Sequence, residues 1–166
     1  MIWHPPILNW VKVKIDGALT KNPAQSSCGG IFRNSDGAYL GGFAQNLNTN
    51  SSFNAELLAA IELAYSKGWL NLWLETDSLL AMLAFRNKYL VAWELRNRWC
   101  NCIELLSNMN FIVSHIYREG ILCANGLANL GLALSSFVWF PSPPPSISAD
   151  FVRNRLDLPN FRCVVS

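Results

Sequence analysis

The stretch WVKVKIDGA, residues 10–18, decides the fold. Apolar and charged side chains alternate along it, with Val11, Val13 and Ile15 on one face and Lys12 and Lys14 on the other. This period of two predicts a strand over residues 10–16 with one buried face and one solvent-facing face. The strand ends on Asp16. An ionised carboxylate in such a place is costly to bury unless a cation holds it.

Working outward, the pattern changes from consecutive strands to alternating strands and helices. Strands are predicted at residues 28–33 and 38–45, on either side of the hairpin turn NSDG at residues 34–37. Further elements are predicted as helix 53–67, strand 70–76, helices 77–85 and 92–107, strand 111–117 and helix 121–134. The fold class is therefore α/β, with a five-stranded mixed sheet of three antiparallel strands followed by parallel strands, flanked by helices.

The chain is expected to form one domain with two flanking segments. Its 166 residues, 51% of them hydrophobic, suffice for a single core. Residues 1–9 are predicted to be an N-terminal arm because they contain a Pro-Pro break, and residues 10–137 to be the domain. Residues 138–166 are predicted to be a linker and tail, because the run PSPPPS is stiff.

Charge and cysteine content bear on partners and compartment. The net charge of +2 neither requires nor excludes nucleic acid. The five cysteines are odd in number and include no CxxC pair, which favours free thiols in a reducing intracellular compartment and no disulfide-linked partner. Nucleus and cytoplasm both remain open. No leader sequence is expected. Residues 120–149 carry no charge, but their apolar side chains recur at helical spacing, which favours a soluble helix over a membrane span.

Three acids stand at the ends of apolar elements: Asp16, Glu56 in FNAELLAA, and Asp77 in LWLETDS. The carboxyl ends of neighbouring parallel strands lie at the same edge of a sheet, so Asp16 and Asp77 are expected to be close, with Glu56 on a helix that covers this edge. Carboxylate oxygens suit Mg²⁺ or Mn²⁺. The alternative for Asp77 alone is a cap on the helix that follows it.

Six short motifs follow one another along the chain: DGA (16–18), Asn22-Pro23, GGIFRNSDG (29–37), NAEL (54–57), ETDS (75–78) and HIYREG (115–120). As a set they resemble the type 1 ribonuclease H domain, and most of all the ribonuclease H-like domains of plant retroelement-type proteins. The resemblance covers most of the chain. It implies a ribonuclease H-like fold and a monomeric, metal-dependent endonuclease that hydrolyses the RNA strand of RNA–DNA hybrids with two Mg²⁺ or Mn²⁺ ions.

The resemblance also implies roles for individual residues. The catalytic residues would be Asp16, Glu56, Asp77 and His115, the metal ligands Asp16, Glu56, Asp77 and Asn125, and the nucleic-acid contacts Asn22, Ser52 and Ser78. His115 lies ten positions before Asn125, the spacing of the histidine and last acid in that family.

Two departures from the family pattern leave a second function open. Asn125 stands where the family has its last acid, and Phe53 replaces an amide expected to read the RNA minor groove. Asn125 is either a degenerate ligand or a helix cap. The alternative to a weakened enzyme is an inactive module that binds nucleic acid or a protein partner, and a third interpretation is a retroelement fragment with no role of its own.

Overall fold

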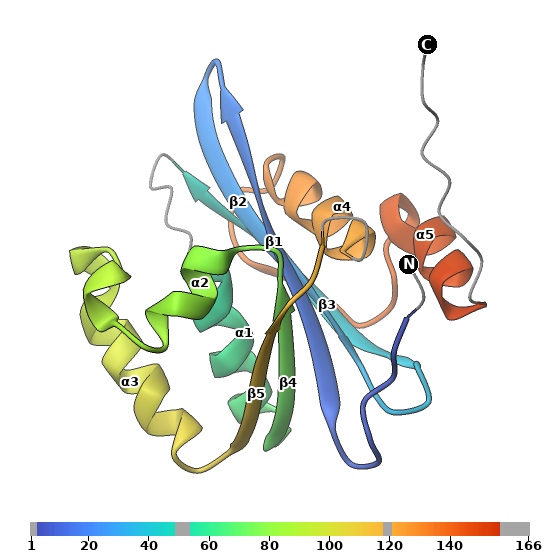
Figure 1. Cartoon of the computed structure of the whole chain (residues 1–166). Coiled ribbons are helices and arrows are strands. Elements are labelled where there is room, and N and C mark those ends of the chain that lie inside the picture. The colour runs from blue at the N-terminus through green and yellow to red at the C-terminus, as the bar shows by residue number, and fades with distance from the viewer. Residues whose placement is uncertain (1–2, 49–53, 118–120, 157–166) are drawn as a thin grey trace.

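The computed structural model describes residues 3–48, 54–117 and 121–156 as a sheet with helices on both faces (Figure 1). The strands are β1 (Val11–Lys21), β2 (Ala24–Arg33), β3 (Tyr39–Asn48), β4 (Asn71–Thr76), β5 (Asn110–His115) and β6 (Val138–Phe140). The helices are α1 (Ala55–Ser66), α2 (Leu79–Ala84), α3 (Arg96–Leu106), α4 (Leu122–Gly131) and α5 (Pro145–Arg155), with short 3-10 turns η1 (Lys88–Leu90) and η2 (Trp93–Leu95).

The sheet has the strand order β5-β4-β1-β2-β3-β6. β1, β2 and β3 are antiparallel neighbours, and β4 and β5 join β1 in parallel. This confirms the predicted mixed sheet and its order of pairing. The predicted number of five strands is wrong, because the three residues of β6 pair with Gly42, Phe43 and Ala44 of β3 and add a sixth strand.

Two segments are more regular than their sequence suggested. No strand was predicted between residues 16 and 28, but β1 and β2 stay paired up to Lys21 and Ala24 and form a long hairpin. The segment expected to be a linker and tail from residue 138 contains β6 and α5. Its side chains are needed in the core: Ile147 is 0% exposed and contributes to an apolar cluster with α4.

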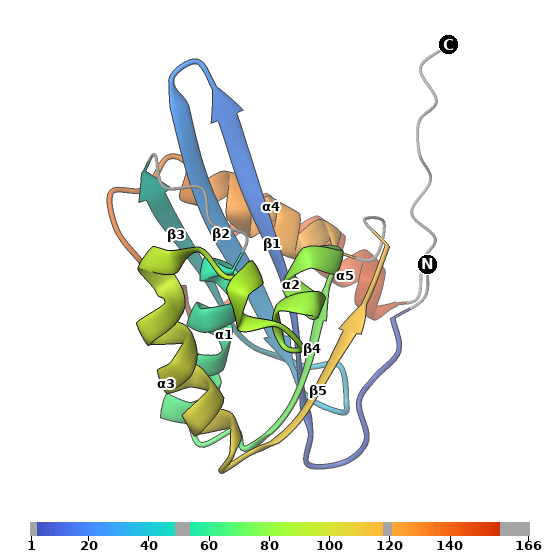
Figure 2. The same cartoon turned by 60° about the vertical axis from the view of Figure 1, so that its left-hand side comes forward.

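The helices form two layers, with α1 and α3 on one face of the sheet and α4 and α5 on the other (Figure 2). The larger core lies under α1 and α3, where Val13, Ile15 and Leu74 of the sheet are fully buried. The smaller core lies under α4 and α5. In the part of the chain that the structure describes, no helix is long and apolar enough to cross a membrane.

One expectation about β1 is corrected. Lys12 and Lys14 do not face solvent but are 1% and 7% exposed. Lys12 Nζ lies 2.6 Å from Glu75 Oε1 and sits 3.7 Å from the centre of the Trp73 ring. The N-terminal arm supplies the cover, since Lys12 Nζ also donates to the carbonyl of His4 at 2.7 Å. The alternating pattern therefore predicted the strand correctly, but the lysines on its polar face are buried, and Lys12 forms an ion pair with Glu75.

Candidate active site

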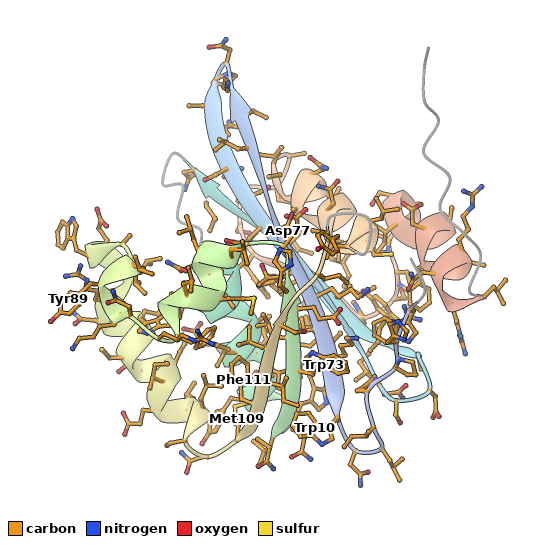
Figure 3. The ribbon with its side chains drawn as sticks, viewed as in Figure 1. Trp10, Trp73, Asp77, Tyr89, Met109 and Phe111 are labelled. Carbon is orange, nitrogen blue, oxygen red and sulfur yellow. The ribbon has the colours of Figure 1, made fainter. Side chains whose placement is uncertain are left out.

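The register of the parallel strands brings two of the predicted acids to one edge. Ile15 of β1 pairs with Thr76 of β4, and this is the last pair between the two strands. Asp16 directly follows Ile15 and Asp77 directly follows Thr76, so the two acids occupy equivalent positions after the last pair. Figure 3 shows Asp77 at the carboxyl end of β4, far from Trp10 and Met109 at the opposite end of the sheet.

Glu56 joins these acids from the first turn of α1, where it is only 6% exposed. The pKa of its carboxyl is raised to about 8, mainly by burial and to a smaller extent by the negative charges of Asp16 and Asp77, against a backbone hydrogen bond that lowers it. Like charges act strongly on each other only at short range. Asp16 and Asp77 are therefore close enough to Glu56 for their charges to act on its carboxyl.

His115 and Ser78 lie beside Asp77. His115 ends β5, and its Nε2 lies 3.1 Å from the carbonyl oxygen of Asp77. A carbonyl only accepts, so this contact requires the proton on Nε2 and leaves Nδ1 as the acceptor of a neutral ring. Ser78 is the N-cap of α2, and its hydroxyl oxygen accepts from the backbone N–H of Ala81 at 3.1 Å. Its hydroxyl hydrogen is still available to a ligand.

Asn125 contacts Asp16 from α4, which covers the face of the sheet opposite to α1 (Figure 2). Its side-chain nitrogen donates to Asp16 Oδ2 at 2.9 Å, and the backbone N–H of Gly17 donates to Asp16 Oδ1 at 2.9 Å. Asn125 lies inside α4, and its own N–H donates to the carbonyl of Ile121 at 2.8 Å, so it does not cap the helix. This removes one of the two interpretations that the sequence left open for Asn125.

A glycine allows α4 to come this close. Gly29 of β2 pairs with Asp16, and a Cβ at this position would lie 2.5 Å from the backbone nitrogen of Ala128. The Ser27 hydroxyl also donates to the carbonyl of Ala128. Any side chain at residue 29 would push the helix away from the sheet. The GG of the motif GGIFRNSDG therefore helps to position Asn125 over Asp16.

Sequence reasoning missed Asn129, which completes this contact. Its side-chain nitrogen lies 3.0 Å from both the backbone oxygen and the side-chain oxygen of Asn125. The available signal was its spacing, because residues four apart on a helix lie on the same face.

Two predicted nucleic-acid contacts lie apart from the acids or outside the described residues. Asn22 is exposed in the turn between β1 and β2, six residues beyond Asp16 along the hairpin. At roughly 3.3 Å per residue this separation is on the order of 20 Å. Ser52 lies outside the described residues, as does Phe53.

The oxygen atoms of the acids are of the type that binds Mg²⁺ or Mn²⁺, but their positions in this structure do not form a metal site. Within residues 3–48, 54–117 and 121–156, no three His, Cys, Asp or Glu side chains form a ready ligand set. The repulsion among three carboxylates opposes their closer approach, and both oxygens of Asp16 accept hydrogen bonds. The oxygens themselves are the type that Mg²⁺ and Mn²⁺ prefer, and the buried Glu56 is the group that a cation would stabilise most.

Comparison with known proteins gives consistent matches. A family model described as reverse transcriptase-like matches residues 14–131. An Arabidopsis thaliana protein, provisionally named a ribonuclease H protein, is 32% identical over 152 residues. These cover 89% of this chain and 24% of that protein, so the chain spans about a quarter of the length of this relative.

Solved structures share the fold. The ribonuclease H1 of the archaeon Halobacterium salinarum superimposes with a TM-score of 0.64 at 26% identity, over 74% of this chain and 97% of that one. A ribonuclease H1 called LC11, solved in complex with an RNA/DNA hybrid, gives a TM-score of 0.61 at 16% identity, over 74% of this chain and 96% of that one.

Proposed function

Because this chain belongs to the reverse transcriptase-like family and has the ribonuclease H fold, as its motifs predicted, we propose that it is a metal-dependent endonuclease for the RNA strand of RNA–DNA hybrids. The observation that supports the proposal is the buried carboxyl of Glu56, whose pKa is raised to about 8 mainly by burial and partly by the charges of Asp16 and Asp77. A structural acid has no reason to be buried among like charges without a cation. Such strongly perturbed groups are typical of functional sites.

Asp16, Glu56 and Asp77 would hold the Mg²⁺ or Mn²⁺. When bound, a divalent ion supplies positive charge for the phosphate and lowers the pKa of a coordinated water. The protein's contribution is to hold the carboxylates on rigid elements. Asp16 is fixed by two hydrogen bonds, and Glu56 is fixed by the first turn of α1.

His115 is proposed to take part in proton transfer. With its Nε2 proton donated to the carbonyl of Asp77, the ring is held beside that acid and Nδ1 can accept a proton. Hydrolysis of a phosphodiester delivers a proton from the attacking water and requires one for the departing oxygen. His115 could accept the proton of the attacking water on Nδ1 and then, with both ring nitrogens protonated, pass this proton to the departing oxygen.

The hybrid is proposed to be held by polar side chains both beside the acids and at a distance from them. Asn22 on the exposed hairpin and Ser78 beside Asp77 would contact the backbone at two separate points, with Ser52 as a third contact. Most contacts to nucleic acid are made to the sugar–phosphate backbone and fix position rather than sequence. We propose that the domain acts as a monomer in a reducing compartment of the cell.

A second candidate function is a module that binds nucleic acid without cutting it. The observation in its favour is that the Asn125 amide donates to Asp16 instead of presenting a fourth carboxylate. A site with fewer negative charges binds divalent ions less tightly. Under this alternative, hybrids would bind equally well with and without metal and would stay intact.

The deciding experiment is cleavage of a hybrid labelled on each strand in turn, in Mg²⁺ and in Mn²⁺, with binding measured in parallel in EDTA. We expect only the RNA strand to be cut, and Asp16→Asn to lower the rate roughly a hundredfold or more with binding retained. The control is Asp36→Asn, which removes an acid from the exposed turn between β2 and β3. Equal rates for the wild type and Asp16→Asn would refute the assignment, and binding without any cleavage would favour the module.

A further inference from the structure

Strand β5 leaves one edge of the sheet open. At the other end of the sheet β6 pairs with β3, whereas no strand within the described residues pairs with β5 on the side away from β4. The backbone N–H groups of Asn110 and Ile116 donate to carbonyls on the β4 side at 2.8 and 2.9 Å. Backbone groups alternate in direction along a strand, so those of Phe111 and Val113 point to the open side.

This open edge has none of the residues that usually protect an edge strand. Residues 110–115, NFIVSH, include no Lys, Arg, Asp, Glu or Pro. Long edge strands without charge or Pro tend to pair with a further chain. Phe111 and Val113 pack against the larger core and are only partly buried, while Ile112 points to the opposite face beside Trp73 and is 46% exposed. The edge therefore offers both backbone groups and apolar side chains to another strand.

The residue types of β5 are arranged symmetrically about Ile112. Apolar Phe111 and Val113 stand on either side of it, and polar Asn110 and Ser114 follow at the next positions. If two such strands pair antiparallel about a two-fold axis at Ile112, then Asn110 faces Ser114, Phe111 faces Val113, and Ile112 faces its own copy. An aromatic residue opposite a β-branched one stabilises antiparallel strands. The strand is therefore complementary to a second copy of itself on both faces of the sheet.

We propose that β5 pairs with β5 of a second copy of this chain, antiparallel about a two-fold axis at Ile112, and joins the two sheets in a symmetric dimer. In this register Phe111 of each chain exchanges both backbone hydrogen bonds with Val113 of the other chain. These are the residues whose backbone groups point to the open side. The two copies of Ile112 meet at a non-hydrogen-bonded position, where Cα atoms lie about 4.5 Å apart and side chains touch.

The charge and the length of β5 determine its partner and the strength of the pairing. A charged strand would repel its own copy across the axis, whereas β5 carries no Lys, Arg, Asp or Glu. A strand of this length spans roughly 20 Å, so the buried area falls below the roughly 1,200 Å² of a stable interface, and we expect a Kd on the order of 10–100 μM. Antiparallel pairing places the two candidate active sites at opposite edges of the joined sheet. Each chain keeps its own acids, so the single chain remains the catalytic unit proposed above.

The test is sedimentation velocity of the chain from low micromolar to near-millimolar concentration. We expect the wild type to change from one chain to two as the concentration rises. Ile112→Lys places two ammonium groups opposite each other at the axis and should weaken the association roughly tenfold or more. The matched control is Ile103→Lys, which makes the same change at a residue of α3 that is 41% exposed and should leave the association unchanged. Both residues are exposed, so both variants should fold, and circular dichroism checks this.

A disulfide tests the register. In a background with Cys100→Ser and Cys163→Ser, Ile112→Cys should give a disulfide-linked dimer on mild oxidation, because the facing Cα atoms lie within the range that a disulfide spans. Asn110→Cys is the control on the same strand and the same face. Its two copies would be offset by four residues along the paired strands, roughly 13 Å, so they should stay unlinked.

Three results would overturn the inference. A single chain at every concentration would refute the second copy as the partner of β5. An association that Ile112→Lys and Ile103→Lys affect equally would mean that the copies meet through another surface. Equal linkage of Ile112→Cys and Asn110→Cys would indicate random collision instead of a fixed register. These measurements require neither nucleic acid nor metal, so their outcome is independent of the proposed function.

Discussion

Removing one partner of the buried ion pair between Lys12 and Glu75 should cost far more stability than removing one partner of an ion pair at the surface. The two side chains are 1% and 9% exposed, and the nitrogen and oxygen lie 2.6 Å apart. Glu75→Gln would leave the Lys12 ammonium buried beside Lys14 with no carboxylate to neutralise it. Removing one partner of a buried pair typically costs about 3–5 kcal/mol. For a chain of this length, that corresponds to a fall in the melting temperature of roughly 6–20 °C.

The assay is urea unfolding at neutral pH, followed by tryptophan fluorescence, and the matched control is Glu62→Gln. Glu62 also pairs with a cation at 2.7 Å, but its side chain and that of Arg98 are 39% and 37% exposed. An exposed pair of this kind contributes about 0–1 kcal/mol. If Glu75→Gln and Glu62→Gln lower the free energy of unfolding by the same amount, burial does not set the strength of the pair and the reasoning is refuted.

Measuring the free energy of unfolding as a function of pH provides an independent check of the charges of Lys14 and Glu75. Burial lowers the pKa of Lys14 from 10.5 to about 8, against the opposing charge of Glu75. Between these two values the unfolded chain binds more protons than the folded one, so this group makes stability rise with pH. In Glu75→Gln the opposing charge is gone, so the rise should start at a lower pH. An unchanged pH profile would mean that Glu75 does not act on Lys14.

Three further predictions concern other parts of the molecule. Gly29→Ala, which brings a Cβ to 2.5 Å from the nitrogen of Ala128, should cost about 1–3 kcal/mol in urea unfolding, and a cost near zero would show that α4 can move away freely. In a background without Cys163, a thiol reagent should modify the exposed Cys100 rapidly and Cys102 slowly, because burial raises the pKa of the latter to about 12. Rapid labelling that survives Cys100→Ser would contradict this. In EDTA, the free energy of unfolding should fall as the pH rises from 4.5 to about 8, by at most about 1.4 kcal/mol per pH unit, because Glu56 has a pKa of about 8 in the folded chain and keeps a proton that the unfolded chain releases. Glu56→Gln should abolish this slope.

The acids at the sheet edge could be predicted because local patterns determine their position. The period of two in residues 10–16 sets the direction of β1, and a helical period identifies α1 with Glu56 in its first turn. Helix α1 joins β3 to β4, and strands joined in this way run parallel, so β4 has the direction of β3 and of β1, and Asp16 and Asp77 lie toward the same end of the sheet. Each step in this reasoning uses neighbours in the sequence plus one general rule of topology.

The features that could not be predicted depend on partners far apart in the sequence. The Pro-rich segment after residue 137 looked like a linker, but β6 is a strand only because β3 offers it an edge. Lys12 looked exposed because nothing local shows that Glu75 and the arm cover it. The hydrogen bond from Asn125 to Asp16 joins residues that are 109 positions apart in the sequence and lie on different layers of the fold.

An amide at residue 125 would favour the metal-free state of the proposed site over its metal-bound state. A carboxylate there would add a fourth negative charge beside Glu56, whose pKa is already raised by Asp16 and Asp77. The amide instead donates to Asp16 and lowers the repulsion among the acids when no ion is bound. The same donor would lower the affinity of the proposed site for a divalent ion, because it bonds to an oxygen of Asp16 and brings no negative charge of its own. If the site binds metal as proposed, stability without metal and affinity for metal are therefore opposed at residue 125.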